Sequence, residues 1–222
     1  MNLTRLLTIF IFACCIVCNS SYAQNIERVY QSNIKTPQLF VYGNQQSLPV
    51  YTLNSAERLE LEFDDTDGSV KSYYYTFVLC DYDWNPVNIS PFNYIKGFTQ
   101  NRITTYRYSS ISLTNYTHYQ AFLPDRNSAP IKSGNYLLKV FLDGDTSKLA
   151  FTKQMLVLES KASVSAAVVQ PLSAQLFNTH QKLKMSINIG SINSFSAAQQ
   201  VKVVVLQNNR WDISLRDIPP TF

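Results

Sequence analysis

The stretch from Asp64 to Pro86, DDTDGSVKSYYYTFVLCDYDWNP, constrains the fold more than any other part of the sequence. Side chains alternate between the two faces of a strand, and in Val70–Asp81 both faces are rich in aromatic and aliphatic residues. A strand that is apolar on both faces belongs in the middle of a covered sheet. The Asp-Gly turn ending at Gly68 precedes this strand, and Pro86 ends it because proline has no amide hydrogen. The stretch therefore predicts a central strand bounded by two turns.

Further strands are predicted on both sides of the central strand. In Glu57–Phe63, leucine and phenylalanine alternate with glutamate, and the turn that follows predicts a hairpin with the central strand. A second hairpin is predicted from Asn135–Leu142 and Lys148–Leu158, which are joined by an Asp-Gly-Asp turn. The other strands expected before residue 160 are Gln38–Tyr42, Pro49–Leu53, Arg102–Ser110 and Tyr116–Leu123.

The strand pattern predicts the fold class and the domain organisation. Seven or eight strands without sustained helical periodicity predict an all-β, antiparallel sandwich of immunoglobulin-like or fibronectin-like shape over residues 24–160. After Ser160 the sequence becomes rich in Ala, Ser, Val, Gln and Asn, and strands are expected at Ser163–Gln170, Leu183–Ile189 and Val201–Gln207. We interpret residues 161–222 as the start of a second β-domain. Because three strands are little material for an independent sandwich, we expect this second domain to be truncated.

Residues 1–23 have the pattern of a secretory signal peptide. Arg5 precedes the apolar run Leu6–Val17, and small residues place the expected cleavage after Ala23. One alternative is a retained membrane helix, but the run is too short to cross the ~30 Å hydrocarbon layer comfortably. A lipoprotein cut before Cys14 is another alternative. Cleavage after Ala23 would leave Cys80 as the one remaining cysteine, which we expect to be a buried, unreactive thiol.

Composition argues against several function classes. The chain has 222 residues, of which 45% are hydrophobic, and its formal net charge of +4 comes from dispersed lysines and arginines, which does not indicate nucleic-acid binding. Two histidines, His118 and His180, support neither a zinc cluster nor a histidine-based triad. Asp81 and Asp83 are one alternative for an acid–base pair, but the sequence gives no pocket signature around them. We therefore expect no enzymatic activity, no cofactor, no metal and no small-molecule substrate.

The connection from Asn85 to Gln100 is unusually aromatic for a loop. Aromatic side chains present a large apolar area at a low entropy cost, so such a loop can bind a partner protein or a sugar ring. The same side chains can instead cover the core. The sequence leaves both interpretations open for Trp84, Phe92, Tyr94 and Phe98.

Four sequence blocks together resemble the N-terminal domain of the type IX secretion system plug proteins of Bacteroidota. They are the opening stretch, then YIKGFTQNRITTY from Tyr94, YTHYQAFLP from Tyr116 and SGNYLLKVFLDGD from Ser133, and they cover Asp64–Asp145 in this order. The resemblance implies a periplasmic, non-enzymatic protein that docks at the outer membrane against the periplasmic mouth of the giant β-barrel translocon and closes it. Family members usually continue well beyond residue 222, and the region after Ser160 resembles the family only loosely.

A reversible seal of this kind favours a modest patch with aromatic and arginine anchors. The residues expected to contact the partner are Trp84, Phe92, Tyr94, Phe98 and Arg102. The alternative function is a carbohydrate-binding sandwich of a polysaccharide-uptake system, in which Trp84 and the tyrosines would stack on sugar rings.

Overall fold

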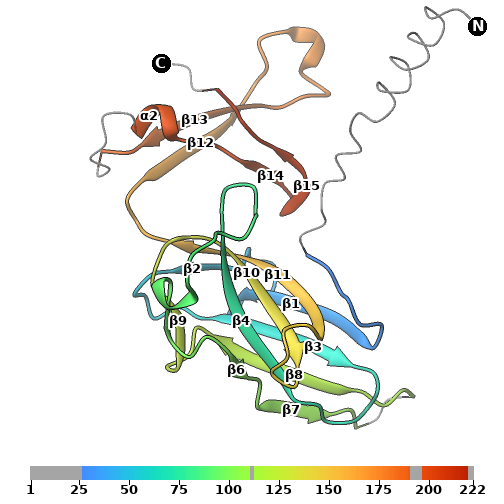
Figure 1. Ribbon diagram of the computed structural model, residues 1–222. Coiled ribbons are helices and arrows are strands. Elements are labelled where there is room, and N and C mark those ends of the chain that lie inside the picture. Colours follow the sequence, from blue (N-terminus) through green and yellow to red (C-terminus); the bar gives the residue numbers. More distant parts are fainter. Residues whose placement is uncertain (1–26, 111–112, 191–196, 220–222) are drawn as a thin grey trace, which may run out of the picture.

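Two facing β-sheets form the first part of the chain in the computed structural model, which describes residues 27–110, 113–190 and 197–219 (Figure 1). The expected signal peptide, residues 1–23, lies outside the described residues. One sheet has the strand order β1 (Ile34–Val41), β3 (Leu59–Asp65), β8 (Thr117–Leu123) and β7 (Thr105–Tyr108). The other has the order β2 (Val50–Thr52), β11 (Leu149–Leu158), β10 (Gly134–Leu142), β4 (Tyr73–Cys80) and β6 (Asn101–Arg102).

The pairing within these sheets is antiparallel except for β2, which runs parallel to β11. When the strands are lettered in chain order with β2 as A′, the first sheet reads A-B-E-D and the second A′-G-F-C-C′. This is the strand order of immunoglobulin-type sandwiches. The predicted all-β sandwich is therefore confirmed.

Aromatic rings from both sheets fill the space between them. The ring centroid of Phe63 in β3 lies 5.0 Å from that of Tyr119 in β8, and the two rings are stacked. The Phe63 ring also meets the rings of Tyr73 in β4 and Phe151 in β11 edge-on, each at 5.0 Å between ring centroids. All four side chains are at most 1% exposed. Each buried ring of this kind stabilises the fold by about 1.5–3 kcal/mol, so this layer joins the two sheets into one core.

The central strand β4 lies between β10 and β6, as the opening stretch predicts. Tyr73, Tyr75 and Phe77 point into the core and are at most 2% exposed, whereas Tyr74 on the other face is half-buried. The second face of β4 is thus covered only in part, unlike the fully covered sheet that its apolar pattern predicts. Cys80 at the end of the strand is buried as expected, and burial raises the pKa of its thiol.

The predicted hairpin between Glu57–Phe63 and the central strand is wrong. Strand β3 pairs with β1 and β8, whereas β4 pairs with β10 and β6 in the opposite sheet. The alternating pattern shows that each strand has a buried face, but it does not say whether the two faces belong to one sheet or to two facing sheets. Residues 66–72 connect the strands and are long enough to cross the ~10 Å between packed sheets.

The second predicted hairpin is confirmed, whereas the strand predicted at Arg102–Ser110 is divided. Strands β10 and β11 pair in register from Gly134 with Val157 to Val140 with Phe151. In the divided segment, β6 belongs to one sheet and β7 to the other, and the chain crosses between them at Ile103, which is 3% exposed. One strand pattern therefore covered two short strands on either side of a buried crossing.

Short elements complete the described chain. The aromatic connection contains the 3-10 helix η1 (Pro91–Asn93) and strand β5 (Ile95–Gly97), which pairs with β9 (Ser128–Pro130). After residue 160, β12 (Ser163–Val169) pairs with β13 (Lys182–Asn188), and β14 (Val205–Gln207) pairs with β15 (Arg210–Leu215). The remaining elements are η2 (Ala174–Leu176) and α2 (Ala197–Gln200). None of the helices in the described part of the chain has the length and hydrophobicity that crossing a membrane requires.

Candidate interaction site

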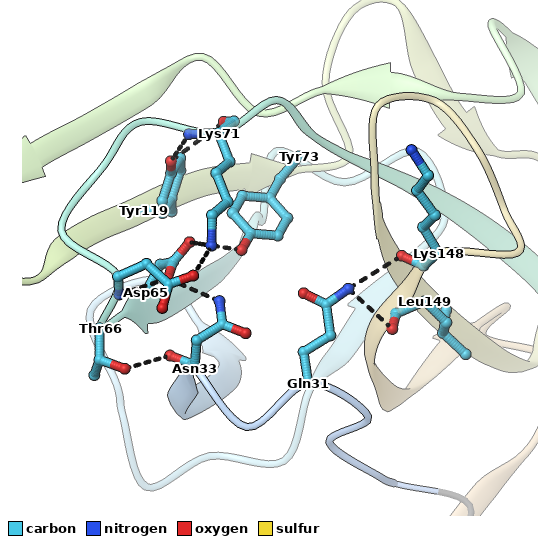
Figure 2. Close-up of polar contacts among 10 residues, drawn as sticks. Gln31, Asn33, Asp65, Thr66, Lys71, Tyr73, Tyr119, Lys148 and Leu149 are labelled. Atoms are coloured by element: carbon cyan, nitrogen blue, oxygen red, sulfur yellow. Dashed lines mark hydrogen bonds and ion pairs between the residues drawn. The ribbon is translucent and has the colours of Figure 1, made fainter.

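A buried carboxylate, Asp65, organises a polar cluster at the end of β3 (Figure 2). Its side chain is fully buried at the end of β3 and accepts hydrogen bonds from the Tyr73 hydroxyl at 2.8 Å and the Asn33 amide at 2.8 Å. The Lys71 ammonium lies 2.9 Å from it, and the backbone N–H of Asp67 donates to it at 3.0 Å. Every acceptor position of this carboxylate is therefore close to a donor.

The electrostatics of this cluster indicate a structural role. Burial raises the pKa of Asp65, but the hydrogen bonds from Asn33, Asp67, Lys71 and Tyr73 outweigh burial, so the pKa lies below its usual value. Burial and the hydrogen bond to Asp65 raise the pKa of Tyr73. A carboxylate that is ionised and fully engaged has no free lone pair for a substrate proton. The cluster anchors residues 66–72 as they cross between the sheets.

The two aspartates considered as an acid–base pair lie in a turn. Asp81 accepts the backbone N–H groups of Asp83 at 2.9 Å and Asn85 at 2.8 Å. These backbone hydrogen bonds, the one from Asn85 most of all, lower the pKa of Asp81. Asp83 instead lies 3.7 Å from the guanidinium of Arg216. Within the described ranges, no group of three His, Cys, Asp or Glu side chains is placed to hold a metal ion.

The five residues expected to contact a partner fall into two sets. Trp84 and Tyr94 are 4% exposed and belong to the core, where the Trp84 ring meets Trp211 edge-on at 5.0 Å. Phe92 is 74% exposed, Phe98 is 67% exposed, and Arg102 is exposed as well. Trp84 and Tyr94 thus cover the core, whereas the aromatic connection presents Phe92 and Phe98 to solvent.

Local backbone structure holds the exposed pair in place. Phe92 lies in η1, which begins with a proline, and the N–H of Phe98 donates to the Asn127 carbonyl at 2.7 Å. Gly97 before it has φ +90°, and a Cβ there would lie 2.1 Å from the same carbonyl oxygen. Only glycine permits this close approach. Both phenylalanines therefore project from a structured segment.

Sequence reasoning missed two arginines that lie close to Arg102. A pocket of about 370 Å³ is lined by Arg58, Arg102 and Arg126, together with residues of the β6–β7 crossing and the end of β8. Arg58 and Arg126 lie outside the four sequence blocks that carry the family resemblance, and Arg102 lies within one of them. Their proximity follows from the strand order, so no sequence signal pointed to it.

A larger cleft of about 1050 Å³ separates the sandwich from the β14–β15 hairpin. Figure 1 shows the loop after β4 extending toward this hairpin. The charged residues that line the cleft pair with one another: Lys153 with Glu27 at 2.6 Å, Arg210 with Asp212 at 2.5 Å, and Arg216 with Asp83 at 3.7 Å. Because these charges cancel locally, the cleft has no concentrated charge of either sign.

Comparisons with known proteins give the relationships of the chain. A family model described as the type 9 secretion system plug protein first domain matches residues 34–159. The crystal structure of a hypothetical protein from Parabacteroides merdae superposes with a TM-score of 0.82 at 29% sequence identity. That match covers 88% of this chain but 49% of the other, so this chain spans about half the length of that protein. No curated protein matches. With more than half of its residues matched by the family model, the chain belongs to the family of type 9 secretion system plug proteins, of which it contains the first domain.

Proposed function

We propose that the protein is a non-enzymatic subunit of the type IX secretion system that occludes the periplasmic opening of the outer-membrane translocon. The observation that carries this proposal is the family match over residues 34–159. A tightly packed sandwich suits steric occlusion, because protein interiors are dense and deform little. The protein would act from the periplasm, associated with the outer membrane, with the giant β-barrel translocon as its partner.

In this proposal, the contact is made by exposed residues of the aromatic connection, residues 85–100, which we also call the aromatic segment, and of the adjacent strand β6. Phe92 and Phe98 offer apolar anchors, and Arg102 offers a planar cation that binds carboxylates or carbonyls. An interface based on a few such anchors can be specific and still release its partner. Trp84 and Tyr94 would act indirectly, by fixing the aromatic segment on the core.

The carbohydrate-binding alternative depends on an accessible aromatic platform. Trp84, the ring expected to stack on a sugar, is 4% exposed and covered by Trp211. The family match therefore favours the plug function over this alternative.

A triple variant of the natural full-length protein tests the proposed contact. We expect Phe92→Ala, Phe98→Ala and Arg102→Ala together to reduce co-purification with the translocon from outer membranes at least tenfold, because all three side chains are exposed anchors. The control is Tyr30→Ala, which removes another exposed aromatic ring, 49% exposed, from the opposite end of the domain sequence. If the triple variant co-purifies as well as the control, the contact lies elsewhere.

If cells that lack the protein keep a tight outer membrane while the channel is empty, the plug function itself is wrong.

A further inference from the structure

Three arginines without acidic partners line one small pocket. Among the described residues, Arg58, Arg102 and Arg126 form no ion pair, and the one hydrogen bond from these guanidiniums is donated by Arg102 to the Ser72 hydroxyl at 3.0 Å. This is unusual for the molecule, because most other charged side chains near a cleft are paired. Three unpaired guanidiniums around about 370 Å³ make a strongly cationic pocket.

Asp125 is the one carboxylate among the residues that line this pocket, and it offsets one of the three arginine charges. Asp125 accepts the Asn101 amide at 3.0 and 2.9 Å and the backbone N–H groups of Asn127 at 2.7 Å and Ser128 at 2.8 Å. Its oxygens are therefore engaged in holding the loop. The pocket keeps a net positive charge, and guanidiniums bind carboxylates and phosphates through paired N–H donors.

The pocket lies where a sheet edge is open. Thr104 and Thr105 line it at the start of β7, and Ala121 and Phe122 line it from β8. Strand β8 pairs with β7 only from Thr117 to Gln120, so among the described strands its last residues have a partner in β3 alone. A chain segment that paired with β7 and continued past Thr105 would meet the side of the pocket that Thr104 and Thr105 form.

Among the described edge strands of the sandwich, β7 is also the least protected. Edge strands are shielded from pairing by prolines, bulges or short length. Strand β1 contains Pro37 within an irregularity between Lys35 and Gln38, and β2 and β6 have three and two residues. Strand β7 has four exposed residues in continuous register and no proline, and its Tyr106 and Tyr108 are 42% and 63% exposed.

We propose that the free edge of β7 and the arginine pocket together bind an extended, acidic segment of a partner protein. The backbone of the segment would pair with β7, as in strand addition, and its Asp or Glu side chains would enter the pocket. The open edge favours a polypeptide over a free phosphate, because a phosphate uses the guanidiniums but not the strand. This inference goes beyond the proposed function. The arginine pocket and the proposed translocon contact both include Arg102, but the pocket does not require the translocon to be its partner.

Direct binding of a labelled peptide tests this site. The probe is a fluorescent peptide of alternating threonine and glutamate, about ten residues long, which is the upper end of the usual strand length. It is compared with the same peptide in which lysine replaces glutamate and with a version whose alternate backbone amides are methylated. We expect the glutamate peptide to bind and the other two to bind at least tenfold more weakly, because one lacks the charge and the other lacks the backbone donors.

Protein variants locate the binding. The double variant Arg58→Gln, Arg126→Gln should have about tenfold weaker affinity for the glutamate peptide. Each substitution removes a cation from an exposed side chain without altering a buried contact. Lys35→Gln, which removes an exposed charge at the opposite edge of the same sheet, should leave the affinity unchanged. Circular dichroism checks that all variants fold.

Several results would overturn the inference. Equal binding of the lysine peptide, or full affinity of the double arginine variant, would show that the pocket is not the site. Full affinity of the methylated peptide would exclude strand addition, and displacement of the peptide by an equimolar amount of inorganic phosphate would show a site for small anions. Loss of peptide binding by the double variant with unchanged co-purification with the translocon would support this site while leaving the proposed function intact.

Discussion

At the scale of single residues, the buried Asp65 shows how the fold tolerates a charge in its core. An isolated ion would be costly to bury, but the carboxylate is surrounded by the Tyr73 hydroxyl, the Asn33 amide and the Lys71 ammonium at 2.8–2.9 Å. The Tyr119 hydroxyl extends the network to the backbone of Lys71, whose N–H donates to it at 2.7 Å. The cluster therefore fixes the chain where it crosses between sheets.

Replacing Asp65 with asparagine should destabilise the protein by about 3–5 kcal/mol at pH 7, because the variant leaves Lys71 without its buried partner. The pKa of Asp65 is lowered in the folded state, so its contribution is complete above the usual value of 3.8 and is lost as the pH falls through the lower folded pKa. Urea unfolding of both proteins at several pH values measures this. The difference in unfolding free energy should stay constant from neutral pH to about pH 5 and shrink below about pH 4.

Asp67→Asn is the matched control. Its carboxylate also contacts Lys71 but is 54% exposed, so its loss should cost less than about 1 kcal/mol. A difference for Asp65→Asn that persists undiminished at low pH would mean that the effect comes from packing and not from charge.

At the scale of elements, the aromatic segment depends on the pairing of β5 with β9. This pairing brings the backbone of Gly97 against the Asn127 carbonyl, in a conformation with φ +90°. The exposed Phe98 follows directly, and the buried Tyr94 precedes the strand. The close contact between Gly97 and the Asn127 carbonyl thus lies between the buried Tyr94 and the exposed Phe98.

Gly97→Ala should destabilise the protein by about 2–4 kcal/mol, because the added Cβ would meet the carbonyl oxygen at 2.1 Å in addition to the cost of positive φ. Gly43→Ala provides the control, since Gly43 has a similar φ of +82° but no atom within 4 Å of a Cβ. That variant should cost about 1 kcal/mol from backbone strain alone. Thermal unfolding compares the two, and equal costs would show that the close approach does not matter.

At the scale of the whole molecule, the two tryptophans of the chain meet between the sandwich and the β14–β15 hairpin. Trp84 has a positive φ of +66° in the loop after β4, and Trp211 lies in β15. The Lys202 ammonium lies 4.4 Å from the Tyr82 ring centre in the same region, and Asn209 donates to the Gln46 carbonyl at 3.2 Å. A few contacts therefore link the two parts.

Trp211→Ala should expose residues 161–219 to limited proteolysis, because it removes the aromatic contact that links β15 to the sandwich. The unfolding free energy of the sandwich should fall by only about 0.5–1.5 kcal/mol, the value of one edge-on ring pair. Ile213→Ala is the control, since Ile213 lies two residues further along β15 and is 47% exposed. If both variants resist the protease like the unmodified protein, the tryptophan contact does not hold the two parts together.

The pattern of the sequence determined the long strands of the sandwich and the fold class. Alternation in β3 and the apolar run of β4 are local properties, and so is the turn chemistry that joins β10 to β11. The resemblance that identified the plug family also rests on local blocks of sequence, and the family match confirms it. Of the five expected contact residues, the sequence indicated the aromatic segment but could not tell which rings face outward.

Tertiary structure decided everything that depends on which strands become neighbours. Alternation gives each strand a buried face but no partner, so the placement of β3 and β4 in different sheets was not in the pattern. The burial of Trp84 depends on Trp211, more than a hundred residues away along the chain. The gathering of Arg58, Arg102 and Arg126 depends on the pairing of β3 with β8 and on the crossing from β6 to β7. Contacts between residues far apart in sequence arise only when the sheets pack. For that reason the sequence alone determined the long strands, whereas packing determined the division of Arg102–Ser110 into β6 and β7 and the sites.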